Sequence, residues 1–295
     1  QSVIVHESIY KKVKDEFGFK TATEVANAHH VYAALEADVD ILWIGARSTV
    51  NPFTVQEIAV ALKGTNKPVL VKNPVNPDLA LWIGALERLL GQDVKNLGVI
   101  HRGFSSYQKT KYRNLPNWQI ALDFKHQYPN IPMFVDPSHI CGRRDLLSDV
   151  TQEAFNVGYE GAMIESHCNP DAAWSDAAQQ ITPEVLAEML GNLQIRNSDI
   201  SGFDEEMGKH RALISDIDFQ LIELLSNRMK ISEKIGALKK ENNIAIFQPD
   251  RWKVIAEYAS ARAEESGMGK DFIEKVFKAI HEESIEVQNN IMIDK

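Results

Sequence analysis

Residues 68–102, PVLVKNPVNPDLALWIGALERLLGQDVKNLGVIHR, contain a strand, a helix and a second strand in direct succession. The apolar runs Pro68–Lys72 and Leu97–Arg102 have strand length, and Asp78–Leu90 between them has the periodicity of an amphipathic helix. A strand–helix–strand unit of this size is typical of a parallel sheet. This segment therefore predicts an α/β fold.

The same alternation extends from residue 19 to about residue 190. The other apolar runs of strand length are Phe19–Val25, Ile41–Ala46, Pro132–Val135 and Gly161–Glu165. Six successive units with polar residues at the strand ends favour a (β/α)8 TIM barrel over an open sheet. Residues 6–17 are expected to form the helix before the first strand. Because a TIM barrel has eight strands, we expect two strands and a helix to precede Gln1 in the complete protein; the alternative is an unusual six-stranded fold.

The composition excludes several classes of protein. Of the 295 residues, 44% are hydrophobic and 25% charged, as in globular domains. A net charge of −9 argues against nucleic acid or an anionic membrane surface as the main partner. No apolar run approaches the roughly 18 residues that span a bilayer. With two cysteines and no visible signal peptide, a cytoplasmic protein is expected.

A change of pattern after residue 190 indicates a second domain. We predict a barrel over residues 1–190 and a linker rich in Gly, Asn, Ser and Asp over 191–206. Residues 207–295 follow as an all-α domain with helices at Met207–Asn242, Asp250–Glu265 and Asp271–Asn290. Three helices of this size cannot bury their apolar stripes alone, so we expect an intertwined homodimer.

Three successive strands of the predicted barrel end in a cation: Arg47, Lys72 and Arg102. Because the carboxyl ends of barrel strands meet at one face, these cations predict an anion site for phosphate or carboxylate. Each one alone is also compatible with a strand end that reaches water.

His139, Glu165 and Asp176 follow the last two strands of the predicted barrel. Together they offer one nitrogen and two carboxylate oxygens, a donor set that suits a divalent metal. Each of them alone is more often an ordinary polar residue. A metal beside an anion site indicates polarisation of a carbonyl or phosphoryl oxygen.

Six motifs in the first region resemble, in order, the barrel of the 3-deoxy-D-arabino-heptulosonate 7-phosphate (DAHP) synthase family. They are GAR at 45–47, VKN at 71–73, HRG at 101–103, DPSH at 136–139, GRRD at 142–145 and MIESH at 163–167. The resemblance implies condensation of phosphoenolpyruvate with erythrose 4-phosphate, with a divalent metal of the Mn, Fe, Co or Zn class.

The resemblance also implies a role for each residue of this site. Arg47, Lys72 and Arg102 would bind phosphoenolpyruvate, Lys72 could pass a proton, and Arg143 would meet the sugar phosphate. The metal ligands would be His139, Glu165 and Asp176. The family's cysteine ligand on the first strand and its Lys-Pro-Arg segment after the second strand are not in this sequence, and Cys141 and Cys168 lie elsewhere. The 295 residues therefore predict an incomplete site.

Cations lie within the apolar stripe of the first long helix. At roughly 100° per residue, the stripe contains Ile214, Ile217, Leu221, Leu225, Ser232 and Ile235. Arg228 and Lys239 fall inside it, and Arg211 lies at its edge. Because an unpaired buried charge is costly, the pattern predicts a cationic pocket for a small polyanion. The alternative is that both cations extend outward from the ends of the bundle.

Residues 207–290 resemble the all-helical chorismate mutase family. The motifs are RALISDIDFQLIELLSNRMKISEKIGALKK at 211–240, PDR at 249–251 and IHEESIEVQ at 280–288. The resemblance implies rearrangement of chorismate to prephenate, with Arg211 reaching the partner's site. It assigns the carboxylates to Arg211 and Arg228, the ether oxygen to Lys239 and Gln288, and supporting roles to Arg251 and Ser284. Trp252 stands where a glutamate is often found, and Gln248 replaces an acidic residue of some relatives.

The leading interpretation is a bifunctional shikimate-pathway enzyme with feedback by prephenate or chorismate. One alternative is an octulosonate 8-phosphate synthase barrel that takes arabinose 5-phosphate. Others are a chain with mutase activity only, or a helical domain that serves as a non-catalytic dimerisation and regulatory module.

Overall fold

The computed structural model describes residues 7–107, 109–196 and 204–293 of the chain. The chain divides into two compact units, Gln1–Ser198 and Asp199–Lys295. The division falls within the predicted linker 191–206, part of which lies outside the described residues.

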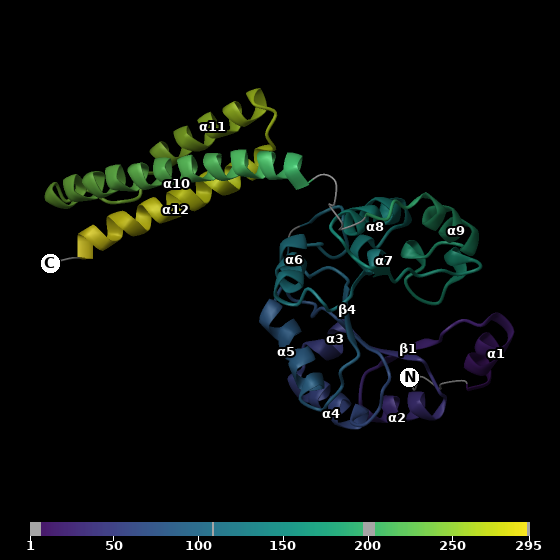
Figure 1. Cartoon of the computed structure of the whole chain (residues 1–295). Coiled ribbons are helices and arrows are strands. Elements are labelled where there is room, and N and C mark those ends of the chain that lie inside the picture. Colours follow the sequence, from purple (N-terminus) through teal and green to yellow (C-terminus); the bar gives the residue numbers. More distant parts are fainter. Residues whose placement is uncertain (1–6, 108, 197–203, 294–295) are drawn as a thin grey trace. The chain divides into compact units, whose positions relative to one another are not determined.

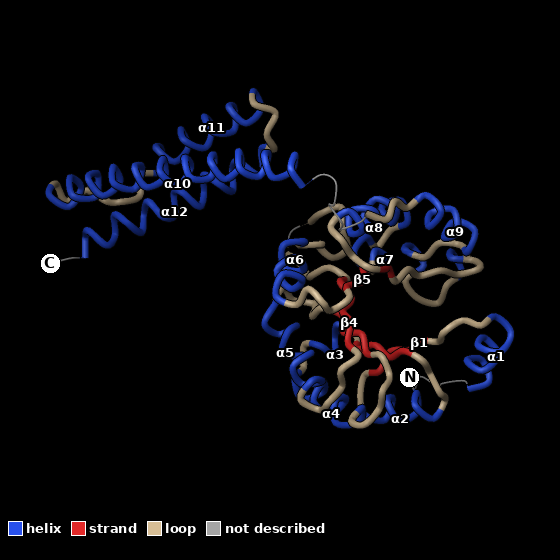
Figure 2. Tube along the Cα trace, in the orientation of Figure 1, coloured by secondary structure: helices blue, strands red, loops and turns tan. Residues whose placement is uncertain are grey.

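The first unit contains a parallel sheet of six strands in the order β1-β2-β3-β4-β5-β6. The strands are β1 (Ala22–Val25), β2 (Ile41–Ile44), β3 (Val69–Lys72), β4 (Leu97–His101), β5 (Met133–Val135) and β6 (Gly161–Ala162). All six predicted strands are confirmed, each somewhat shorter than its apolar run. The described sheet is curled like part of a TIM barrel, with β1 and β6 as its edges, and is not closed (Figure 2).

Helices line the outer side of this curled sheet (Figure 1). They are α2 (Ala28–Glu36), α4 (Pro52–Leu62), α5 (Leu79–Leu90), α6 (Trp118–Gln127), α8 (Leu147–Asn156) and α9 (Pro183–Asn192). Helix α1 (Glu7–Phe17) precedes β1, and the short helices α3 (Ala46–Thr49) and α7 (Pro137–Cys141) directly follow β2 and β5. Capping side chains mark the N-terminal ends of two of these helices, α5 and α4. The Asp78 side chain accepts a hydrogen bond from the backbone N–H of Leu81, and Asn51 caps α4 directly before Pro52.

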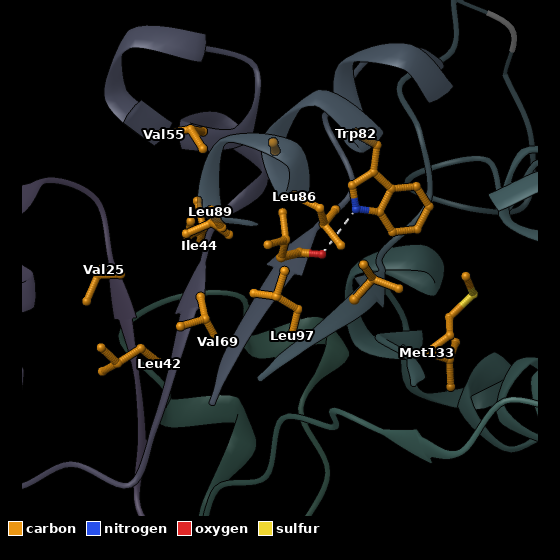
Figure 3. Close-up of a cluster of buried hydrophobic side chains, with 14 of the residues drawn as sticks. Val25, Leu42, Ile44, Val55, Val69, Trp82, Leu86, Leu89, Leu97 and Met133 are labelled. Carbon is orange, nitrogen blue, oxygen red and sulfur yellow. Dashed lines mark hydrogen bonds between the residues drawn. The ribbon is translucent and has the colours of Figure 1, made fainter. Parts of the chain in front are cut away.

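The core lies between the sheet and these helices. Strand β2 buries Leu42 and Ile44 against the helices, whereas Ile41 and Trp43 point to the other face and stay half-buried. Figure 3 shows Trp82 of α5 above the strands, with its indole Nε1 donating to the carbonyl oxygen of Val71 at 3.2 Å. The outer face is therefore tightly packed, and the polar strand ends remain available for a site.

The second unit consists of three helices, α10 (Asp204–Glu241), α11 (Pro249–Glu265) and α12 (Lys270–Ile293). The predicted three-helix organisation is confirmed, with ends that differ by up to about one turn. The predicted stripe on α10 is largely uncovered within a single chain: Ile214, Ile217 and Leu221 are 58%, 55% and 52% exposed. Two other helices cannot cover a helix of 38 residues along its whole length.

Gly236 lets α10 approach α12 closely. A Cβ at this position would lie 3.2 Å from both Cα and Cγ of Gln288, which is tighter than ordinary contact. None of the described helices is long and apolar enough to cross a membrane.

Candidate active sites

The carboxyl ends of the strands surround a cavity of about 330 Å³. Its lining includes all three predicted strand-end cations, Arg47, Lys72 and Arg102, together with His139 and Asp176. Gly45 also lines the cavity. A Cβ at this position would collide with the carboxylate of Glu24, so the glycine leaves room for that side chain to reach the cavity from β1. Side chains from all six strands or the loops after them therefore meet at one face.

Lys72 is held by a buried ion pair. Its Nζ lies 2.7 Å from Oδ2 of Asp136, and both side chains are almost fully buried. Burial alone would raise the pKa of Asp136, but the hydrogen bond from His139 and the charge of Lys72 lower that pKa to about 2. Asp136 also caps α7 by accepting from the backbone N–H of His139 at 3.0 Å. Asp136 thus fixes both the lysine and the histidine.

Arg102 is preorganised from both sides. Its Nη1 donates to Oδ1 of Asn114 at 2.8 Å, and its backbone N–H donates to Oδ1 of the fully buried Asn73 at 2.7 Å. Burial lowers the pKa of the Arg102 guanidinium, although an arginine remains charged. A cation placed in this way can bind an anion without first losing side-chain freedom.

His139, Glu165 and Asp176 come together as a candidate metal-ligand set. Each offers one ligand atom, and these atoms all lie within 4.8 Å of one another. Nδ1 of His139 lies 3.6 Å from Oε1 of Glu165. One imidazole and two carboxylates at this separation fit a divalent cation. Cys141 is buried and Cys168 exposed, and neither belongs to this set.

Arg113 is a cavity residue that the sequence analysis missed. Its Nη1 donates to Oδ1 of Asp176 at 2.6 Å and to Oε1 of Gln179 at 2.7 Å. The hydrogen bond from Arg113 lowers the pKa of Asp176. Gln179 in turn donates to Oε2 of Glu165 at 3.0 Å. Arg113 and Gln179 therefore orient two of the three candidate metal ligands.

Arg143 does not line this cavity in the described part of the chain. Its guanidinium is exposed and pairs with Asp145, with Nη2 donating to Oδ2 at 2.8 Å. The hydrogen bond and charge of Asp145 raise the pKa of Arg143. The structure thus brings together six of the seven predicted barrel residues and leaves Arg143 apart.

A buried histidine, His101, directly precedes Arg102 at the end of β4. Nε2 of His101 lies 2.6 Å from the carbonyl oxygen of Pro116, and its Nδ1 lies 2.9 Å from the hydroxyl of Tyr159. Because a carbonyl only accepts, Nε2 carries the proton and Nδ1 accepts from Tyr159. Burial lowers the pKa of His101 to about 4, so the imidazole is neutral at pH 7.

This shift predicts a pH-dependent stability of the first unit. The pKa of His101 falls from 6.5 to about 4 on folding, so the unfolded chain binds more protons between these values. The free energy of unfolding should therefore decrease as pH falls from 6.5 to 4, by about 3 kcal/mol for this group. Urea unfolding at several pH values measures it. His101→Gln should flatten the curve, whereas His126→Gln on the exposed side of α6 should not; equal slopes in all three proteins would contradict the prediction.

The three helices of the second unit enclose another cavity of about 330 Å³. Its lining includes five of the six predicted residues, namely Arg228, Lys239, Arg251, Ser284 and Gln288. Arg211 is exposed on α10 and does not line it in the described residues. Polar side chains that are up to 60 residues apart in the sequence, from Arg228 to Gln288, thus converge on one space.

The cations of this cavity are oriented by neighbouring groups. Nη1 of Arg228 donates to Oγ of Ser284, which itself donates to the carbonyl oxygen of Ile280 at 2.8 Å. Nζ of Lys239 donates to the carbonyl oxygen of Ile246 at 2.6 Å. Burial lowers the pKa of both cations, and the charge of Arg251 adds to the effect at Arg228. Both cations face the cavity, as the pocket interpretation requires.

The fold and the two cavities define a class of protein: a curled parallel α/β unit with an anion and metal-type site, followed by a helical unit with a cationic pocket. The chain belongs to the DAHP synthetase I family, whose family model matches residues 3–200. Residues 210–289 match the family model described as chorismate mutase type II.

Three similar proteins illustrate the relationship of the two units to other proteins. The phospho-2-dehydro-3-deoxyheptonate aldolase of Thermotoga maritima is 27% identical over 184 residues, 62% of this chain and 52% of that protein. A 2-dehydro-3-deoxyphosphooctonate aldolase of Pseudomonas putida is 29% identical over 216 residues, 66% of this chain and 71% of that protein. The T-protein of Haemophilus influenzae is 28% identical over 87 residues, 30% of this chain and 23% of that protein.

A solved structure shares the fold of the first unit. The crystal structure of the Thermotoga maritima DAHP synthase superimposes with a TM-score of 0.56 at 26% identity, covering 63% of this chain and 53% of that chain. The chain thus spans about half the length of this relative.

Proposed function

We propose that this chain is a bifunctional enzyme of the shikimate pathway. Its first unit condenses phosphoenolpyruvate with erythrose 4-phosphate to DAHP and phosphate, and its second unit rearranges chorismate to prephenate. The observation that carries the proposal is the convergence of two separate sets of cations on two cavities. Both family matches support the pairing of these activities.

In the first cavity, Arg47, Lys72 and Arg102 match a substrate that carries both a phosphate and a carboxylate. The buried ion pair with Asp136 holds Lys72 in place, where its ammonium group can deliver a proton. His139, Glu165 and Asp176 would hold a divalent metal, which supplies Lewis-acid polarisation of the aldehyde oxygen when bound. Arg113 and Gln179 keep two of these ligands oriented.

In the second cavity, the proposed reaction is pericyclic and needs no nucleophile or acid–base pair. The protein has to hold the substrate in its reactive conformation and stabilise charge that develops on the ether oxygen. Arg228, together with Arg211 from a second copy of the chain, suits the carboxylates of the substrate, and Arg251 supports them. Lys239 and Gln288 suit the ether oxygen. Ser284 keeps the guanidinium of Arg228 in position.

A second copy of the chain is proposed to complete the helical unit. Much of the apolar surface of α10 is exposed, at Leu213, Ile214, Ile217, Phe219, Leu221, Ile222 and Leu224. An intertwined homodimer would cover this surface and bring Arg211 of one copy to the cavity of the other. Prephenate bound in that dimer is proposed to lower the synthase rate. A synthase rate that prephenate leaves unchanged would remove the regulatory part of the proposal.

Metal removal separates the two proposed activities. Chelation with EDTA should lower formation of DAHP by at least about 100-fold, since the aldehyde loses its polarising group, and should leave chorismate turnover unchanged. Release of phosphate from phosphoenolpyruvate and disappearance of chorismate measure the two rates in the same purified protein. Adding back Mn²⁺, Fe²⁺, Co²⁺ or Zn²⁺ one at a time identifies the metal.

Two controls sharpen this test. Glu165→Gln should reproduce the effect of EDTA on the synthase, whereas Glu36→Gln at the end of α2 should not. Arabinose 5-phosphate in place of erythrose 4-phosphate tests the octulosonate alternative that one group of relatives raises. Synthase activity that survives chelation would rule out the metal-dependent reaction.

A further inference from the structure

The helical cavity contains a histidine to which the proposed reaction gives no role. His281 lies on α12, three residues before Ser284, and lines the cavity. Its Nε2 is buried and has no hydrogen-bond partner. Oε1 of Gln288, which lines the same cavity, is the other such atom among the described residues of this unit. Buried polar atoms without a partner are unfavourable, and a ligand in the cavity can satisfy them.

An aromatic stack fixes the plane of this imidazole. The rings of His281 and Trp252 lie 4.4 Å apart between centroids, with an interplanar angle of 21°. Phe247 adds a second ring, at 6.1 Å from that of His281. Trp252 comes from α11, directly after the cavity residue Arg251, so the stack ties the imidazole to a second wall of the cavity. A side chain held in this way presents one orientation to a ligand.

Burial and the surrounding charges favour the neutral form of His281. Arg228 and Lys239 face it from α10, Arg251 is on α11, and Glu282 is its neighbour on α12. Burial and the positive charge of Arg228 and Lys239 lower the pKa of His281, and Glu282 only partly opposes them. A neutral imidazole has one donor and one acceptor nitrogen. It therefore suits a hydroxyl group, whereas the cations suit carboxylates.

We propose that His281, braced by Trp252, is a specificity residue that hydrogen-bonds a hydroxyl group of the anionic ligand in the helical cavity. This inference rests on the proposed mutase function and deepens it, because the proposed substrate chorismate carries a ring hydroxyl besides its two carboxylates. A site that hydrogen-bonds a hydroxyl discriminates against an analogue without it, since the protein group is then left unpaired. Trp252 acts through His281 and is a positioning residue.

The test compares chorismate with an analogue that lacks only the ring hydroxyl. The wild-type protein should prefer chorismate by about tenfold to a hundredfold in kcat/KM. In His281→Phe this preference should vanish, through a loss on chorismate and not on the analogue. His281→Gln, which keeps a neutral hydrogen-bonding group, should retain part of the preference. Trp252→Ala should weaken it, whereas Trp252→Phe, which keeps a stacking ring, should preserve it.

The matched control is His126→Phe on the exposed face of α6, which should leave the preference unchanged. A His281→Phe protein that still prefers chorismate to the same extent overturns the inference. Absence of chorismate turnover in the wild type instead removes the proposed mutase function. If His281→Phe does not fold, the wild-type ring resonances of His281, assigned by their loss in His281→Gln, should shift when prephenate is added; unchanged resonances would also overturn the inference.

Discussion

Lys72→Met should reduce DAHP formation by about 10²- to 10⁴-fold, the usual contribution of a positioned acid–base group. Methionine keeps the length and the apolar stem of the side chain but removes its charge. The cavity then loses one of three strand-end cations and the only one that is paired with the buried Asp136. Measured rates of phosphate release from phosphoenolpyruvate should fall accordingly, and chorismate turnover should not change.

Stability has to be separated from activity in this experiment. Lys72→Met leaves Asp136 buried without its partner, and breaking a buried pair costs about 3–5 kcal/mol. The double variant Lys72→Met with Asp136→Asn removes that charge, so it should regain much of the free energy of unfolding without regaining synthase activity. Lys63→Met, at an exposed position that ends α4, is the matched control. Recovery of activity together with stability would show that Lys72 has only a structural role.

Sequence alone predicted the six strands because each is a short apolar run that ends in a polar residue. Strand-end residues are also predictable as a site, since parallel strands place them at one face. Arg113 and Gln179 could not be found in this way, because they lie outside the strands and reach the metal ligands only through tertiary structure. Arg143 was predicted from its motif but does not line the cavity, because its guanidinium pairs with the nearby carboxylate of Asp145.

The helical unit shows a second limit of sequence analysis. The positions of Arg228 and Lys239 within an apolar stripe identified the cavity, because a buried cation needs an anionic partner. The pattern gave no sign of His281, which becomes notable only through its stack on Trp252 from another helix. Ile214 and Ile217 of the stripe are exposed in the single chain, in agreement with the expectation that three helices cannot bury their apolar stripes alone.

Arg228→Ala should reduce chorismate turnover by about 10²- to 10³-fold, the loss expected when one preorganised donor to a developing or bound anion is removed. Arg228 is half-buried, faces the cavity and is oriented by Ser284. Arg228→Lys keeps the charge but not the planar two-pronged donor, so it should recover only part of the rate. Disappearance of chorismate measures all three proteins, with Lys230→Ala, exposed on the same helix, as the control.

The same variant decides between the enzymatic and the regulatory view of the helical unit. If this unit only senses a ligand, Arg228→Ala abolishes feedback by prephenate on DAHP formation, and the wild type has no mutase activity to lose. If the unit is an enzyme, both chorismate turnover and the response to prephenate fall, because the substrate and the product carry two carboxylates each and use the same cations of one cavity. A wild type that turns over chorismate would contradict the purely regulatory view. An Arg228→Ala protein within about tenfold of that wild type would contradict the role proposed for Arg228, since that loss is under 1.4 kcal/mol.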